Sequence, residues 1–119
     1  MSIIQIQGGI PRAAAVVDGR ATPPVYKSNS GQFTTNGISR IAAGVYHLTL
    51  SQPINVDRCD VLITHVIHPG AGVPPGPPTF IGSCAYRVVS TTVIEVIVGD
   101  PGGYGNFDAE FSIRVVQVA

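Results

Sequence analysis

The chain has 119 residues, the length of one ordinary domain. Hydrophobic residues make up 45% of it and charged residues only 12%, about half of the charged fraction that is usual in globular proteins. This composition excludes an intrinsically disordered chain, which buries too little apolar surface to offset the entropy of ordering. So few charges indicate either a large core or an apolar surface that a partner covers.

The net charge is zero, because seven acidic residues balance seven basic ones. The basic residues stand singly along the chain, so we expect no binding to a nucleic acid, which requires clustered cations. No apolar run approaches the roughly 20 residues that span a bilayer, so we expect no membrane insertion. The opening MSIIQIQGG lacks the basic and long apolar segments of a signal peptide, which predicts synthesis in the cytoplasm without one.

Short β-strands are predicted along almost the whole chain. Ten prolines and fourteen glycines interrupt any helical period, and β-branched residues dominate the intervals. Short strands separated by Gly, Pro, Asn and Asp are typical of antiparallel sandwiches. We therefore expect one all-β domain over residues 1–119, a single antiparallel β-sandwich with residues 1–8 as an N-terminal arm or edge strand. The predicted strands, in chain order, are 3–7, 12–17, 25–27, 32–34, 38–42, 45–51, 60–67, 80–89, 93–98 and 108–118.

Alternation of residue types separates the two faces of several predicted strands, because successive side chains of a strand point to opposite sides. Every second residue of VYHLTLS and of EFSIRVV is a large apolar one, and we assign these residues to the core. They are Tyr46, Leu48, Leu50, Phe111, Ile113 and Val115.

The segment CAYRVVSTTVIEVIV predicts a β-hairpin with a defined register. A three-residue loop at 90–92 pairs Val89 with Val93 and Arg87 with Glu95. A slip of one residue would place Arg87 opposite the apolar Ile94, so the charge pair favours the first register. We interpret Arg87 and Glu95 as a cross-strand ion pair and not as a catalytic pair.

Two predicted strand regions are apolar on both faces. Apolar side chains surround the Arg87–Glu95 pair of the hairpin, and the strand DVLITHVI carries apolar residues on its two sides. Such strands need cover on both faces, and one sandwich interior covers only one of them. The sequence therefore predicts a homo-oligomer. The candidate interface residues are Val61, Ile63, His65, Val89, Val93 and Ile97.

The stretch HPGAGVPPGPPTF contains five prolines. Its glycines do not fall at every third position, which excludes collagen. As an interdomain linker it would leave about 39 residues behind it, too few for a second core. We predict a loop over residues 68–79 within one domain, restricted by its prolines and placed for recognition. The candidate binding residues in this loop are Pro74, Pro75, Pro77 and Pro78.

Tyr104, in GDPGGYGN, is a further candidate for binding. A tyrosine between glycines either reaches a partner, such as a sugar ring, or packs down onto the sandwich, and the sequence leaves both alternatives open.

No pattern of residues points to catalysis, a metal or another cofactor. The three histidines, His47, His65 and His68, have no partner that the sequence identifies, so we expect no enzyme. We interpret His65 as a core or interface histidine. Cys59 and Cys84 form no CxxC pair, and we favour two buried thiols over a disulfide.

The order of segments resembles short β-sandwich domains of bacteriophage tail fibres and related virion proteins, which are similar in shape to the trimeric jelly rolls of the C1q and tumour-necrosis-factor type. The resemblance lies in GGIPRAAAVVDG, SGQFTTNGISRIAAGVYHLTLSQPI, DVLITHVI, RVVSTTVIEVIV and NFDAEFSIRVV, which together cover most of residues 9–118. These motifs are structural, and none of them is catalytic. The loop over 68–79 departs from the pattern, because it is longer and richer in proline.

The resemblance implies a homotrimer that displays loops at one end. It implies a non-enzymatic structural or attachment protein, located in a virion or extracellular particle, with other virion proteins or a host-surface glycan as partners. A carbohydrate-binding module is the alternative function.

Overall fold

The structure is a computed structural model, and it describes residues 10–66, 83–100 and 105–117. The described residues form nine β-strands and no helix, so no helix among them is long and apolar enough to cross a membrane. The predicted all-β class is confirmed. The strands are β1 (Ile10–Asp18), β2 (Val25–Asn29), β3 (Phe33–Ala42), β4 (Val45–Leu50), β5 (Cys59–Val66), β6 (Ser83–Val88), β7 (Val93–Asp100), β8 (Gly105–Asn106) and β9 (Glu110–Gln117).

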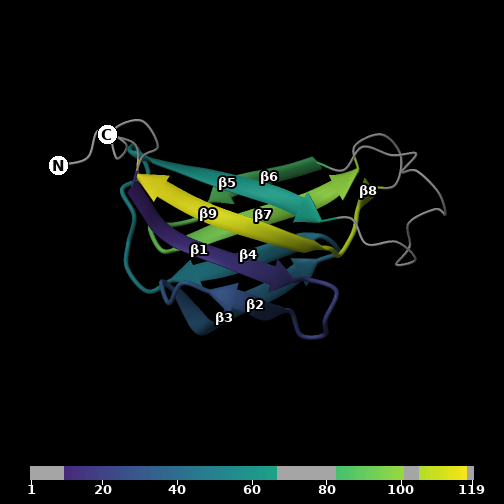
Figure 1. Ribbon diagram of the computed structural model, residues 1–119. Helices are drawn as coiled ribbons and strands as arrows, with labels where there is room; N and C mark the ends of the chain where they lie inside the picture. Colours follow the sequence, from purple (N-terminus) through teal and green to yellow (C-terminus); the bar gives the residue numbers. More distant parts are fainter. Residues whose placement is uncertain (1–9, 67–82, 101–104, 118–119) are drawn as a thin grey trace.

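The strands form two antiparallel sheets that pack face to face as a β-sandwich (Figure 1). The first sheet has the order β2-β1-β9-β5. The second sheet has the order β3-β4-β7-β6, with the two-residue strand β8 beside β7. Strands that are neighbours in the first sheet, such as β1 and β9, are far apart in the sequence, so the sandwich closes only when the two ends of the chain meet.

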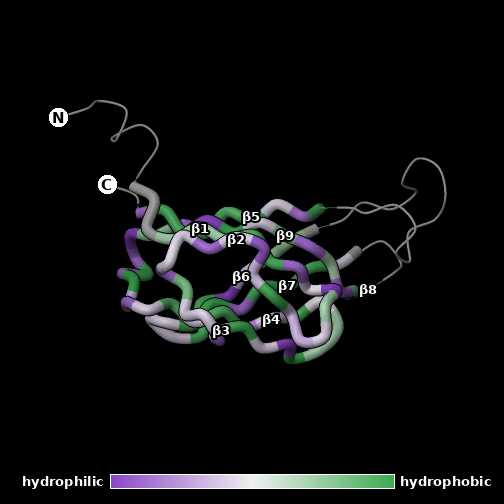
Figure 2. The backbone as a smooth tube through the Cα atoms, turned by 60° about the horizontal axis from the view of Figure 1, so that its bottom comes forward, coloured by the Kyte–Doolittle hydropathy of each residue, from purple (hydrophilic) through white to green (hydrophobic). Residues whose placement is uncertain are grey.

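Alternating residues of the strands fill the space between the sheets, as predicted. Hydrophobic and hydrophilic residues follow one another along the strands in Figure 2. Tyr46 of β4 and Phe111 of β9 are fully buried, and their ring centroids lie 5.4 Å apart across the sandwich. Aromatic contacts of this kind add to the burial of apolar surface, so this pair strengthens the contact between the two sheets. The other residues assigned to the core from the sequence are also buried: Leu48, Leu50, Ile113 and Val115.

The β6–β7 hairpin has the predicted register. Arg87 lies opposite Glu95 and Cys84 opposite Val98, and the Val89 N–H donates to the Val93 carbonyl at 2.9 Å. The charge pair alone was therefore enough to predict the register across this short loop.

One predicted break is absent from the structure, one short strand was not predicted, and one predicted strand is not tested. Residues 33–42 form one irregular strand, β3, whose register shifts between Phe33 and Ile38 where the sequence suggested a break. Strand β8 was not predicted, because two residues carry no periodic signal. The predicted strand at 3–7 lies outside the described residues.

The two ends of the sandwich differ in what they carry. The first and last described residues, Ile10 and Gln117, are register partners and lie at one end. At the opposite end, in the view of Figure 1, lie Val66 and Ser83, which flank residues 67–82, and Asp100 and Gly105, which flank residues 101–104. We call this the loop-bearing end, because both segments leave the sheets there.

Candidate functional site

The loop-bearing end is held together by Asp108, which lies between β8 and β9. Its carboxylate accepts hydrogen bonds from the Gly44 N–H at 2.9 Å, from the Tyr46 hydroxyl at 2.8 Å and from Arg40 Nε at 3.0 Å. Burial raises the pKa of Asp108, but these hydrogen bonds outweigh it and lower the pKa overall. The carboxylate thus ties the start of β9 to the β3–β4 turn.

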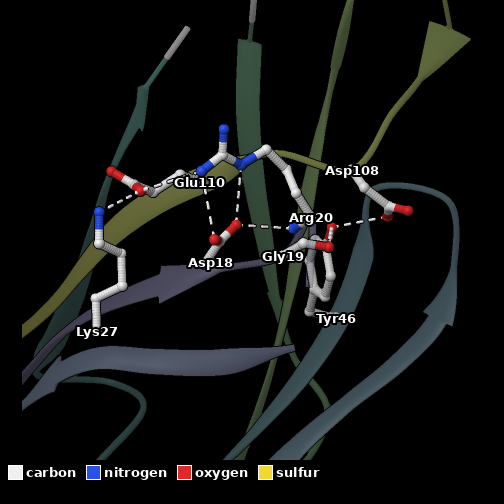
Figure 3. Close-up of polar contacts among 7 residues, drawn as sticks. All are labelled: Asp18, Gly19, Arg20, Lys27, Tyr46, Asp108 and Glu110. Carbon is white, nitrogen blue, oxygen red and sulfur yellow. Dashed lines mark hydrogen bonds and ion pairs between the residues drawn. The ribbon is translucent and has the colours of Figure 1, made fainter. Parts of the chain in front are cut away.

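Two glycines allow this close packing. Gly44 has a φ of +70°, and a Cβ there would collide with the Val98 carbonyl. A Cβ on Gly19 would collide with the Tyr46 hydroxyl, which lies 3.1 Å from the Gly19 carbonyl oxygen (Figure 3). At both positions the backbone approaches its neighbour too closely for any other residue.

A second polar cluster lies beside the first, on the outer side of the first sheet (Figure 3). Asp18 and Glu110 are directly opposite each other in the β1–β9 ladder, a placement that repels two carboxylates. Arg20 pairs with Asp18 at 3.0 Å and Lys27 with Glu110 at 2.8 Å, so each carboxylate has a cation. The hydrogen bond from Arg20 lowers the pKa of Asp18. The two carboxylates and two cations therefore neutralise one another beside the loop-bearing end.

His65 lies beneath the same end, on the inner side of β5. Its ring centroid is 5.3 Å from that of Phe107, and neither ring nitrogen has a hydrogen-bond partner among the described residues. Burial lowers the pKa of His65, because the charged imidazolium would lose its hydration. The side chain behaves as a neutral packing group.

The outer face of the second sheet carries a different arrangement. Glu95, in the central strand β7, is only 8% exposed although it faces away from the core. Its Oε2 lies 2.8 Å from His47 Nε2 and 3.1 Å from Arg87 Nη2. The hydrogen bond from His47, followed by that from Arg87, lowers the pKa of Glu95, so the carboxylate is ionised and the His47 Nε2 carries the proton that it donates.

Apolar side chains surround this charged centre on the same face. The register places Val45 and Ala85 beside Ile97, and Val89 beside Val93. Val89 is 47% exposed. An apolar surface around a satisfied charged centre resembles the core of a protein interface more than an ordinary solvated face. We call it the outer face of the second sheet.

The candidate interface residues divide between two places. Val89, Val93 and Ile97 lie together on the outer face of the second sheet, as the register requires. Val61 is 6% exposed and belongs to the core, and Ile63 packs against that core. In β5, Val61, Ile63 and His65 therefore face inward, toward the core and not toward an interface. The large apolar residue that faces outward is Leu62, which is 50% exposed.

The candidate binding residues Pro74, Pro75, Pro77, Pro78 and Tyr104 lie outside the described residues. Cys59 and Cys84 are free thiols, and both are half-buried where the sequence suggested full burial. Burial raises the pKa of the Cys84 thiol. Within 10–66, 83–100 and 105–117, no three His, Cys, Asp or Glu side chains come together in a way that would hold a metal ion.

Sequence reasoning missed the roles of Asp108 and Glu110. Their partners Tyr46 and Lys27 are 62 and 83 residues away in the chain, so no local spacing reveals them. A weak signal was present in NFDAEF, where two acidic residues flank an alanine at the start of an apolar strand. Both carboxylates are used to clamp neighbouring segments, and this fits a structural role better than a chemical one.

Comparison of the chain with protein-family profiles, with characterised proteins and with solved structures finds no match.

Proposed function

We propose that the protein is a non-enzymatic structural or attachment component of a bacteriophage or phage-like particle, and that it works as a homotrimer displaying loops at one end. The particle is suggested by the sequence resemblance to tail-fibre domains. The oligomer and the display of loops are supported by the geometry of the sandwich.

The separation of the two ends of the sandwich is the observation that carries the proposal. Ile10 and Gln117 pair at one end, while the segments 67–82 and 101–104 leave the sheets at the other. An attachment component needs this polarity, because one end is held by the particle and the other meets the target. The clamp around Asp108 keeps the loop-bearing end rigid, as recognition loops on a scaffold require.

The outer face of the second sheet is the surface through which the copies pack. Glu95, His47 and Arg87 satisfy one another there, so burying the face leaves no carboxylate unpaired. The flanking valines and isoleucine supply apolar area, and the zero net charge of the chain adds no long-range repulsion between copies.

Light scattering of the intact protein is expected to give three times the 12.4 kDa mass of one chain. Val89→Lys should release monomers, because it places a charge in the packed face. Val25→Lys is the matched control, since Val25 is 46% exposed but lies on β2 in the other sheet. A monomeric wild-type protein, or a trimer that survives Val89→Lys, would contradict the oligomer.

The proposal that the protein belongs to a phage or phage-like particle is tested separately. Genes for tail or capsid proteins beside the gene of this protein, and detection of the chain in purified particles by antibody labelling, are the expected results. A trimer that is absent from particles would leave the oligomer standing and remove the attachment role.

A further inference from the structure

A cleft of about 590 Å³ opens at the end of the sandwich opposite the loop-bearing end. It lies between the sheets, with Leu50 of the second sheet on one side and the register partners Cys59 and Gln117 of the first sheet on the other. Its volume is within the range of small-molecule sites. We call it the amide cleft, because side-chain amides dominate its polar lining: Gln32, Gln52, Asn55 and Gln117.

The amide cleft is rigid at its walls. The Gln32 carbonyl accepts from the Ser51 N–H at 2.8 Å, and the Ile54 N–H donates to the Thr91 carbonyl at 2.9 Å. The Asn55 carbonyl accepts from the Arg58 N–H at 3.0 Å. The loop over 51–58 is therefore fixed to the strand ends, and a ligand would meet a preformed surface.

The hydrogen bonds determine how two of the amides are oriented. Ser30 Oγ accepts from the Ala14 N–H, so its own proton goes to Gln32 Oε1 at 3.1 Å. Asn55 Oδ1 accepts from the Asp57 N–H at 3.1 Å. Both amide oxygens are thus occupied within the chain, and the two NH₂ groups have no acceptor among the described residues. Gln32 and Asn55 present oriented donors.

The chemistry of the lining selects a class of ligand. None of the described residues that line the amide cleft is charged, which disfavours phosphates and other ions. Leu50, Pro53 and Ile54 add an apolar surface beside the donors. A sugar ring combines hydroxyl oxygens that accept from amides with an apolar C–H face. We infer that the amide cleft binds a neutral saccharide, with the Gln32 and Asn55 NH₂ groups as its hydrogen-bond donors.

This site does not depend on the proposed function, because its lining residues belong to one chain and lie away from the outer face of the second sheet. A protein that proved to be monomeric would still bind through it. Failure of the oligomer and failure of the saccharide site are therefore distinguishable.

The test is an NMR titration of the full-length ¹⁵N-labelled protein with glucose, galactose and N-acetylglucosamine, and with acetate as a carboxylate probe. At least one sugar is expected to shift the side-chain NH₂ signals of Gln32 and Asn55 saturably, with a millimolar Kd that is usual for a small neutral ligand. Acetate at equal concentration is expected to leave them in place.

Two nearly isosteric variants isolate the donors. Gln32→Glu and Asn55→Asp keep an oxygen for Ser30 and for the Asp57 N–H but replace each NH₂ donor with a negatively charged oxygen, so each should weaken sugar binding by roughly fivefold or more. Asn106→Asp adds the same charge on β8, at the loop-bearing end, and should leave the affinity unchanged. Backbone spectra of all variants report whether the fold is intact.

Absence of saturable shifts with all the sugars would overturn the inference. Unchanged affinity in both folded cleft variants would overturn the roles of the two amides. Acetate shifts equal to those of a sugar would show that the cleft takes carboxylates, and the saccharide would be the wrong class.

Discussion

Asp108 receives hydrogen bonds from a backbone amide, a tyrosine hydroxyl and a guanidinium, and its folded pKa is lowered in consequence. A carboxylate of lowered pKa contributes stability that is fully present above its unfolded pKa of about 3.9 and is lost as the pH falls through the lower, folded value. The contribution to the free energy of unfolding is therefore complete at neutral pH and disappears in acid.

Asp108→Asn should lower the free energy of unfolding by about 1–3 kcal/mol at pH 7, as expected for hydrogen bonds to a charged group. The difference from the wild type should shrink as the pH falls below about 4, where the wild-type carboxyl also becomes protonated. Urea unfolding of both proteins across this range measures it. A difference that stays constant with pH would mean that the charge of Asp108 does not contribute.

His65 also has a lowered pKa, but burial is the cause, so the form that the folded protein favours is the neutral imidazole. The unfolded chain takes up the proton first, near pH 6.5, so wild-type stability falls as the pH drops from that value toward the folded pKa. His65→Leu removes this loss of stability in acid, so the variant should gain stability relative to the wild type as the pH falls from about 7.5 to 5. Parallel thermal-unfolding curves at all pH values would contradict the prediction.

At the scale of elements, the β3–β4 turn depends on a glycine for two separate reasons. Gly44 has a positive φ and also lies against the Val98 carbonyl. Gly31, in the β2–β3 turn, serves as a comparison, because it has a positive φ of +99° with open space around it. Gly31→Ala should therefore cost about 1–2 kcal/mol of stability from backbone strain alone. Gly44→Ala should cost clearly more, because the strand ends must also move apart. Chemical unfolding of the two variants measures the difference, and equal losses would show that the close approach is relaxed without cost.

The ladders within each sheet differ in how regular their pairing is. The β1–β2, β1–β9 and β3–β4 ladders contain register shifts, whereas the β4–β7, β6–β7 and β5–β9 ladders run without one. Bulges discourage further pairing at a sheet edge. The β2 and β3 side of the sandwich is thus protected, and the regular strands β4, β7 and β6 form the flat outer face on which we place the contact between copies.

At the scale of the whole molecule, the anchors of the Pro-rich segment are part of the sandwich. Val66 and Ser83 end β5 and begin β6, so the length between them is free to change without moving either strand. A longer loop costs little, about 0.6 kcal/mol per doubling of its length. Stability therefore gives no reason for its length, and under the proposed function the segment serves recognition.

Replacing residues 70–78 with an Asn-Gly turn should leave the oligomeric mass and the thermal unfolding unchanged and abolish attachment of the particle to its target. A Gly-Ser insertion between Ser90 and Thr91, in the hairpin at the opposite end, is the control and should preserve attachment. Light scattering, calorimetry and a particle-adsorption assay provide the three measurements. If the shortened protein attaches as the wild type does, the loop has no role in recognition.

The amino-acid sequence by itself determined the β class, the core residues of β4 and β9 and the register of the β6–β7 hairpin. These depend on a two-residue alternation and on pairing across a short loop, both of which are local. It also identified Val89, Val93 and Ile97 as neighbours, because the hairpin register places them on one face.

Only the tertiary structure decided which strands meet across the fold. The polar clusters and the amide cleft depend on those meetings. β5 is apolar on both sides in sequence, and the packing of β9 and the second sheet is what turned Val61 inward and left Leu62 outside. Asp108 meets Tyr46 at one end of the sandwich, and Gln32 and Asn55 line the amide cleft at the other, because the fold brings separate segments of the chain together at each end. Alternation indicates that a strand has a buried face, but it carries no information on which distant strand covers that face. The covering strand is determined by the packing of the whole chain.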